Sequence, residues 1–537
     1  MIMKRLYIAA LALAAVLPAA AQDTYESARL LGSDLNGTAR YVGMGGAMEA
    51  LGADISVIGT NPAGIGLFRH SSVSTSFGLV AQDGVEKFDG LGKTNMSFDQ
   101  IGFVYSSRIS RASFINLAFN YHKSRNFDQI LSAANSLRNL SQNGLTYDKA
   151  EREDVRKGGF YWDLNNQDYV IGYEDYASDY RAQTFSQSDY LNLNALMLGM
   201  DPNNEGGYDP WIGYNVADSY LFDRSHRGWI SDFDFNISGN SEDRFYWGVT
   251  IGLHDVNYKG FSIYSEGLLD VDDADAGIVD YADRREIEGT GFDVKAGFIF
   301  RPVEESPFRI GVSVSTPTWY ELTTNNDTEM NNDSKEGLKD FMSTGEGYKF
   351  RFYTPWKLGA SLGHTLGSKV ALGASYEYSN YGASTNRIID GDDGYGYYYD
   401  ERTHSDRVME DNTENSLKAV HTLKLGAELK PMPELSVRLG YNYVSPAYET
   451  NGMRDMTLDS PGVAYSSTTD YVNWQATNRF TCGLGYRTGG FSIDLAYQYS
   501  TTNGDFHPFQ PYASGNSGVT EVSNKRHQLL MTLGYTF

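Results

Sequence analysis

Apolar and polar residues alternate strictly at the end of the chain. One face of the last ten residues is apolar, formed by Leu529, Met531, Leu533, Tyr535 and Phe537, and the intervening positions are mostly small or polar. The same alternation runs through residues 491–499 and 435–443. A period of two with one continuous apolar face is typical of a transmembrane β-strand.

Eleven further segments have this character, which predicts about fourteen strands in all. They lie near residues 72–82, 98–106, 111–122, 228–239, 243–256, 288–301, 307–320, 346–363, 368–381, 417–430 and 475–487. An even number of strands suits a single-chain barrel whose two ends meet on one side. A soluble β-sandwich is the alternative, but it does not require so continuous an apolar face on nearly every strand.

Short and long connections alternate along the predicted strands. The short links are 107–110, 239–242, 302–306, 431–433 and 489–490, and the longest polar loop is about 123–227. This asymmetry is typical of the periplasmic turns and extracellular loops of outer-membrane barrels. We expect short helices in the long loop near 129–140 and 191–198. Aromatic residues near strand ends are expected in interfacial girdles: Tyr105, Tyr121, Tyr320, Tyr353, Trp356, Tyr381 and Tyr443.

The first residues have the character of an export signal. Lys4 and Arg5 precede an apolar run over 6–17 and a small-residue stretch over 18–21, which predicts cleavage before Gln22. Losing these two cations takes the net charge from −24 to −26, and so acidic a chain is not expected to bind nucleic acid. Beyond the signal, no run reaches the roughly 18 apolar residues of a membrane helix. The single Cys482 excludes an internal disulfide.

The segment that follows, residues 22–70, breaks the strand pattern. It contains Gly43, Gly45 and Gly46, and then the sequence Asn61-Pro62-Ala63-Gly64. So many glycines do not form a stable helix or strand alone, and irregular backbone at membrane depth must be shielded inside protein. A nucleotide-binding glycine loop is a poor fit, because no buried strand precedes it and no βαβ unit follows.

These residues resemble the hatch of the FadL/TodX family of outer-membrane transporters. The resemblance rests on the 43–47 and 61–64 motifs, on 51–54, and on Thr316-Pro317-Thr318-Trp319 and 354–359 in the barrel. It implies a fourteen-stranded barrel plugged by an N-terminal hatch, taking up long-chain fatty acids or aromatic hydrocarbons that leave sideways through the wall. The chain departs from the family by its longer loops, so the family's ligand does not transfer directly.

The alternation also predicts charged side chains that face the lumen. A buried charge must pair or reach water, so we interpret these residues first as a network that holds the hatch, and second as contacts for a substrate carboxylate. They are Asp232, Asp234, Asp293, Lys295, Arg309, Lys357, Glu377, Lys424, Glu428, Arg438, Arg479, Arg487 and Asp494.

No catalytic, cofactor or metal site is predicted. The histidines are scattered, and neither a Gly-x-Ser-x-Gly elbow nor a His-Glu-x-x-His motif occurs. The acidic stretches 270–275 and 390–394 do not match an EF-hand, and we interpret them as solvated loops.

Together these patterns predict three segments: a signal peptide over 1–21, a hatch over 22–70 and a transmembrane all-β barrel over 71–537. The predicted function is passive uptake of hydrophobic small molecules, gated by the hatch. The alternatives are a porin-like water-filled channel and a structural or adhesive barrel. The expected surroundings are outer-membrane lipid, lipopolysaccharide and the barrel assembly machinery, with the C-terminal Phe537 as the assembly signal.

Overall fold

The computed structural model describes residues 22–151, 160–163, 168–171, 185–195, 198–200, 211–269, 275–334, 337–389, 403–512 and 518–537. The expected signal peptide, both acidic stretches apart from Asp275, and parts of the long loop lie outside these ranges. No helix in the described ranges is long and apolar enough to cross a membrane.

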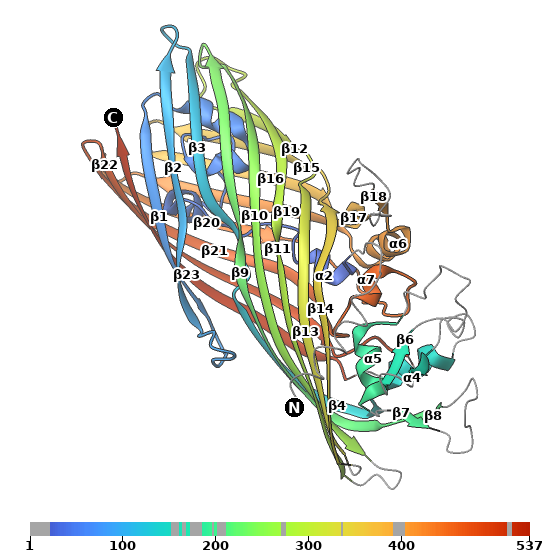
Figure 1. The fold of residues 1–537 in the computed structure, drawn as a ribbon. Helices are drawn as coiled ribbons and strands as arrows, with labels where there is room; N and C mark the ends of the chain where they lie inside the picture. The colour runs from blue at the N-terminus through green and yellow to red at the C-terminus, as the bar shows by residue number, and fades with distance from the viewer. Residues whose placement is uncertain are drawn as a thin grey trace, which may run out of the picture.

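Fourteen antiparallel strands close into a barrel (Figure 1), as predicted. The first strand, β1, pairs with β2 on one side and with the last strand, β23, on the other. The uninterrupted strands are β1 (Ser72–Gln82), β2 (Thr94–Arg108), β9 (Val216–Ser241), β10 (Phe245–Leu269), β11 (Asp275–Phe300), β19 (Ala419–Leu429), β20 (Leu435–Val444), β21 (Tyr471–Thr488), β22 (Phe491–His507) and β23 (Thr520–Thr536).

The other four strands are interrupted partway along. Two of the breaks contain proline, at Pro317 and Pro355, and they lie side by side, because the Thr354 N–H donates to the Thr318 carbonyl at 3.1 Å. The interrupted strands are β3 (Phe114–Asn126) with β4 (Gln129–Leu140), β12 (Arg309–Ser315) with β13 (Trp319–Ser334), β15 (Lys357–Leu366) with β14 (Gly337–Tyr353), and β16 (Val370–Asn380) with β17 (Thr385–Ile389).

Each break inverts the alternation of the strand. In β12 the exposed positions are even-numbered, such as Val312, whereas beyond the break the even-numbered Tyr320 and Leu322 are buried. The prediction that Tyr320 lies in an outer girdle is therefore wrong, since it assumed one phase along the whole strand. The same prediction is wrong for Tyr381, which lies in a 3-10 turn (Tyr381–Ala383) at another break and lines the interior.

An apolar belt surrounds the barrel next to the short turns. On β10, for example, Val249, Ile251 and Leu253 point outward and are 38–52% exposed. The next three outward positions, Asp255, Asn257 and Lys259, are polar. A strand needs about 9–11 residues to cross a bilayer, whereas β10 has 25. The barrel therefore continues well beyond the membrane.

The far end of the barrel carries the long connections. Helices α4 (Asn143–Glu151), α5 (Gln187–Asn194), α6 (Arg407–Ser416) and α7 (Pro461–Ala464) gather there (Figure 1), together with β18 (Thr403–Ser405) and two small hairpins. The hairpins are β5 (Phe160–Asp163) with β6 (Asp168–Ile171), and β7 (Leu198–Met200) with β8 (Trp211–Tyr214). The helix expected over 129–140 is wrong: this segment is β4, because the third strand resumes after its break and pairs with β9. The other expected helix, near 191–198, overlaps α5 and ends at Asn194.

Residues 22–68 lie inside the barrel (Figure 1). They form α2 (Thr24–Ala28), α3 (Ala39–Gly43), η1 (Ile55–Gly59) and η2 (Pro62–Leu67). Figure 1 shows the later three within the half that carries the short turns, while α2 lies toward the loops. Their apolar residues, including Val42, Met48 and Ile58, are buried in one cluster with Val104 and Leu530 of the wall.

Candidate functional site

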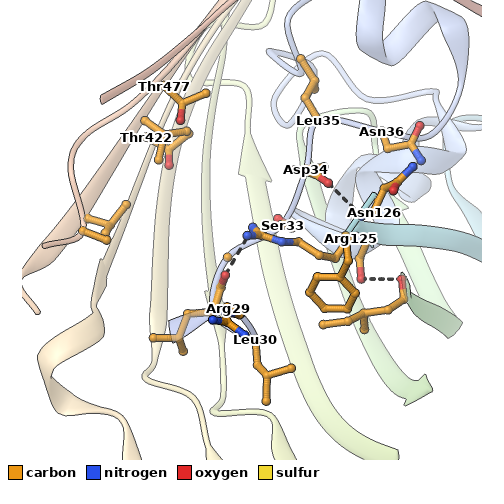
Figure 2. Close-up of a pocket in the computed structure, with 18 of the residues that line it drawn as sticks. Arg29, Leu30, Ser33, Asp34, Leu35, Asn36, Arg125, Asn126, Thr422 and Thr477 are labelled. Carbon is orange, nitrogen blue, oxygen red and sulfur yellow. Dashed lines mark hydrogen bonds between the residues drawn. The ribbon is translucent and has the colours of Figure 1, made fainter. Parts of the chain in front are cut away.

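The main cavity lies between this N-terminal segment and the barrel wall. Its volume is about 380 Å³, within the range of small-molecule pockets. Figure 2 shows Asp34 and Arg125 on one side of this space and Thr422 and Thr477 on strands opposite. Its apolar lining is aliphatic and aromatic, and includes Leu30, Leu31, Phe127, Tyr320, Tyr381, Val444, Tyr448, Val472 and Trp474.

The turns of the N-terminal segment are fixed by capping side chains. Thr38 caps α3, Asp54 caps η1, and Asn61 caps η2 with its side chain accepting from the Ala63 N–H at 3.2 Å. Pro62 occupies the first position of η2, where its missing N–H costs nothing. The 61–64 motif is thus a capped turn, which explains why these residue types follow one another.

Glycines bring the backbone of this segment directly onto the wall. A Cβ added to Gly45 would lie 2.7 Å from the Tyr441 nitrogen, and one added to Gly66 would lie 2.7 Å from the Gly239 carbonyl oxygen. The wall also has glycines at the contact: Gly373 lies directly against the backbone of Ala47, and Gly440 lies against that of Met44–Gly45. No side chain fits between the two surfaces at these points.

Ion pairs join the segment to the wall where side chains do fit. Lys424 donates to Glu49 at 2.7 Å, and Arg40 contacts Glu428 at 3.2 Å. Glu428 also accepts from Arg438 at 2.6 Å. All of these side chains except Arg40 are buried, so each charge depends on its partner.

A group of arginines meets the segment at Asp34. Arg479 Nη2 lies 3.8 Å from Asp34 Oδ1, and the Asn126 N–H donates to Asp34 Oδ2 at 2.9 Å. Arg125 and Arg526 also act electrostatically on this carboxylate. In the described part of the chain, Arg479 is the one of these three arginines that forms an ion pair, with Asp34, whereas Arg125 donates to the Leu31 carbonyl and Arg526 to the Asn126 carbonyl. The group therefore carries more positive than negative charge at the edge of the cavity.

A second contact, beyond the membrane belt, holds α2 to the loops. Arg285 of β11 donates to Glu26 at 2.6 Å, and Arg454 donates to Asp23 at the same distance. Burial alone would raise the pKa of Glu26, but Arg285 and Arg454 outweigh it and hold that pKa below its ordinary value. Helix α2 is thus held at the outer end of the barrel by ion pairs.

The structure brings most of the sequence-predicted lumen residues into three groups. Asp232, Asp234, Asp293 and Lys295 form one cluster; Lys424 and Glu377 lie 3.9 Å apart; and Glu428, Arg438 and Asp494 form a chain of ion pairs. Arg309 donates to the Leu51 carbonyl, Arg479 donates to Asn442, and Lys357 lines the cavity. Arg487 lies apart from these groups, exposed at the rim.

Several residues of the interior were missed from the sequence. His122 and Arg526 share the phase of neighbouring lumen residues and were open to detection by alternation. Arg125 lies beside a strand break, where alternation fails. Glu49 and Arg40 lie in the irregular segment, which has no period to read.

Comparison with known proteins supports the fold. No family model matches the sequence, and neither does any curated protein. Among solved structures, a FadL homologue of Pseudomonas aeruginosa is 10% identical with a TM-score of 0.51, over 94% of this chain and 99% of that one. The toluene transporter TodX of Pseudomonas putida is 9% identical with a TM-score of 0.46, and the toluene transporter TbuX of Ralstonia pickettii is 10% identical with a TM-score of 0.45, both over the same shares. The expected FadL-like fold is confirmed: this chain shares the barrel architecture of the FadL homologue.

Proposed function

We propose that this protein takes up amphipathic, carboxylate-bearing hydrophobic molecules, such as long-chain fatty acids, across the bacterial outer membrane. The observation that carries the proposal is the arginine group at Asp34, next to the apolar lining of the cavity. Guanidinium groups bind carboxylates through paired hydrogen bonds. The aliphatic and aromatic residues nearby offer a surface for a hydrocarbon chain.

We assign the role of the gate to residues 22–70, the predicted hatch. Its backbone contacts with wall glycines support a closed resting state, because they leave no room for solvent at those points. Displacement of Asp34 from its arginines by a ligand carboxylate is the trigger we propose. The ion pairs of Glu49 with Lys424 and of Arg40 with Glu428 would then hold that part of the hatch against the wall, while the part around Asp34 moves.

A sideways exit fits the position of the cavity. Its lining includes Asn126, Phe127 and Gln129, which flank the break between β3 and β4. Beyond the break, the described part of β4 pairs with β9 on one edge, whereas β2 pairs with β3 only as far as His122. We propose this break, which is in register with residues 257–260 of β10 at the outer edge of the apolar belt, as the exit.

The test is binding of paired ligands to purified protein in detergent. Oleate and oleyl alcohol share a chain length and differ in charge. We expect Arg479→Gln to weaken oleate binding about tenfold and to leave oleyl alcohol unchanged, since a charge-assisted hydrogen bond contributes about 1.5–3 kcal/mol. Arg487→Gln, at the exposed rim, is the matched control. Equal binding of oleate by wild type and Arg479→Gln would contradict the proposal.

The polar part of the cavity lining favours one alternative, a porin-like channel. Arg29, Arg224 and Lys295 all line the cavity, and an aqueous pore is lined by such residues. Single-channel conductance in a planar bilayer separates the two functions. A nearly closed channel supports hatch-gated uptake, whereas a large and steady ionic conductance supports the porin.

A further inference from the structure

Six ionisable side chains meet on the lumen face of four adjacent strands, apart from the arginine group at Asp34. They are His122 of β3, Asp232 and Asp234 of β9, His254 of β10, and Asp293 and Lys295 of β11. Register places them together, because Asp232 is paired with His122 on one side and with His254 on the other. All are buried except His122, which is half-buried.

Most of the charged groups in this cluster lie close to a partner of opposite charge. His254 Nδ1 lies 2.7 Å from Asp232 Oδ1, and its Nε2 lies 3.1 Å from Asp293 Oδ2. Lys295 donates to Asp293 Oδ1 at 2.7 Å and to Asp234 Oδ1 at 3.2 Å.

Two buried atoms of the cluster lack a hydrogen bond: His254 Nε2, whose contact with Asp293 is an ion pair only, and the second oxygen of Asp234. Asp234 is 0% exposed, and its Oδ2 has no hydrogen-bond partner among the described residues. A buried carboxylate oxygen left in this state is costly. It faces His122, whose Nδ1 is 3.6 Å away, while His122 Nε2 is 3.8 Å from Asp232 Oδ2. These separations are too long for hydrogen bonds.

The charges of the cluster do not balance either. Three carboxylates face two cations, the Lys295 ammonium and the His254 imidazolium, whose two nitrogens both contact carboxylates, so one carboxylate of this buried cluster has no cation to balance it. A divalent cation, bound with release of one proton from the cluster, would balance the charges and would give Asp234 Oδ2 a partner.

We propose that His122, Asp232 and Asp234 bind a divalent transition-metal cation of the Zn²⁺ class. One ligand atom from each residue lies within 4.8 Å of the others. Zn²⁺ binds nitrogen and oxygen at about 2.0–2.2 Å, so its ligands lie about 3.3 Å apart and small side-chain rotations close the site. The imidazole ligand favours this class over Ca²⁺ or Mg²⁺, which prefer oxygen alone.

The hatch leaves the fourth coordination position open. A Cβ on Gly59 would lie 3.6 Å from both Asp234 Oδ2 and His122 Cε1, so the glycine leaves space above these two ligands. Gly59, His122 and Asp232 line the main cavity, which provides a path for the ion. The neighbouring Ile58 carbonyl accepts from Thr250 of the wall at 3.1 Å. The cation site therefore lies where the hatch rests on β9 and β10.

The test uses the full chain, purified without a polyhistidine tag, stripped with a chelator and titrated with Zn²⁺ by calorimetry. We expect one ion per chain, and at least tenfold weaker binding in both Asp234→Asn and His122→Gln. His421→Gln is the matched control, because it removes an exposed histidine outside the cluster. Co²⁺, added separately, should give the visible absorption of a site with a nitrogen ligand in wild type and should lose it in His122→Gln.

Three outcomes would overturn the proposal: no Zn²⁺ binding by wild type, undiminished binding by His122→Gln, or binding of Ca²⁺ in preference to Zn²⁺. Heat-modifiable mobility in gels reports whether each variant is folded. If Asp234→Asn fails this check, His122→Gln decides the matter alone, since the side chain of His122 is half-buried and its replacement perturbs the fold less. Neither variant touches the arginine group, so oleate binding distinguishes failure of this site from failure of the proposed uptake function.

Discussion

Replacing Gly66 by alanine tests whether backbone contact seats the hatch. The added Cβ would lie 2.7 Å from the carbonyl oxygen of Gly239 in β9. Ordinary van der Waals contact begins at about 3.4 Å, so the two surfaces must separate by about 0.7 Å. β9 is hydrogen-bonded to strands on both sides, and the hatch is therefore the part that moves.

The expected cost is at the lower end of that for overpacked cores, about 1–2 kcal/mol. Since 1.4 kcal/mol is a factor of ten, the displaced state of the hatch should become about tenfold more populated. Global unfolding is a poor readout, because alanine also restricts the unfolded chain and recovers about 0.4–1 kcal/mol. The frequency of opening events in planar bilayers reports the seating directly.

The matched control is Gly59→Ala, also in the hatch. The nearest atoms to its added Cβ are 3.6 Å away, which is ordinary contact. We expect Gly59→Ala to open as rarely as wild type, measured in the presence of a chelator so that the proposed cation site has no part. Equal opening frequencies for Gly66→Ala and Gly59→Ala would refute the reasoning that backbone contact closes the barrel.

Three further predictions concern the ends and the interior of the barrel. Because the pKa of Glu26 is lowered in the fold, its ion pair stabilises α2 at pH values above the solvated pKa of about 4.3, and this stabilisation is lost as the pH falls through the folded pKa. Pepsin cleavage near α2 should therefore increase in that acid range, and it should increase less in Glu26→Gln. The comparison with Glu26→Gln separates the effect of Glu26 from that of Asp23, whose pKa is raised by burial. Glu428→Gln leaves the buried guanidinium group of Arg438 and the half-buried one of Arg40 facing a neutral amide, and it should destabilise the barrel by about 3–5 kcal/mol, seen as a lower urea midpoint. Deletion of Phe537, which is 68% exposed and whose N–H donates to the Ser71 carbonyl, should reduce the yield of inserted protein in membranes, and normal yield would contradict an assembly role.

Period-two alternation was enough to predict the barrel and its strand number. One face of each strand must meet lipid, and this demand appears in the sequence wherever the strand is regular, as in residues 491–499. The charged partners on the other face followed from the same alternation, which is why Asp232, Lys295 and Arg438 were identified.

Alternation failed where the strands break. Beyond Thr316-Pro317-Thr318 the inward phase changes from odd to even positions, which moved Tyr320 from the expected outer girdle to the interior. The segment 129–140 was misread for a related reason, because outside the membrane belt β4 no longer needs an apolar outer face. Neither the break nor the end of the belt has a local sequence signature as strong as the alternation itself.

The contacts of the hatch were beyond sequence reasoning altogether. Its glycines indicated close approach, but not which surface they approach. Gly45 meets Tyr441 and Gly66 meets Gly239, and the members of each pair are more than 170 positions apart in the sequence. Only the closed barrel brings them together.

The contact between the backbone of the hatch and the backbone of the barrel wall has a consequence for sequence divergence among proteins of this architecture. A contact surface made of carbonyl oxygens and Cα atoms does not depend on the identity of any side chain, provided that the few glycines at the contact are kept. Mutations elsewhere can then accumulate without loosening the plug. The cavity at Asp34 and the loops beyond it are made of side chains, so drift and selection can reshape what the barrel admits while the seal stays the same.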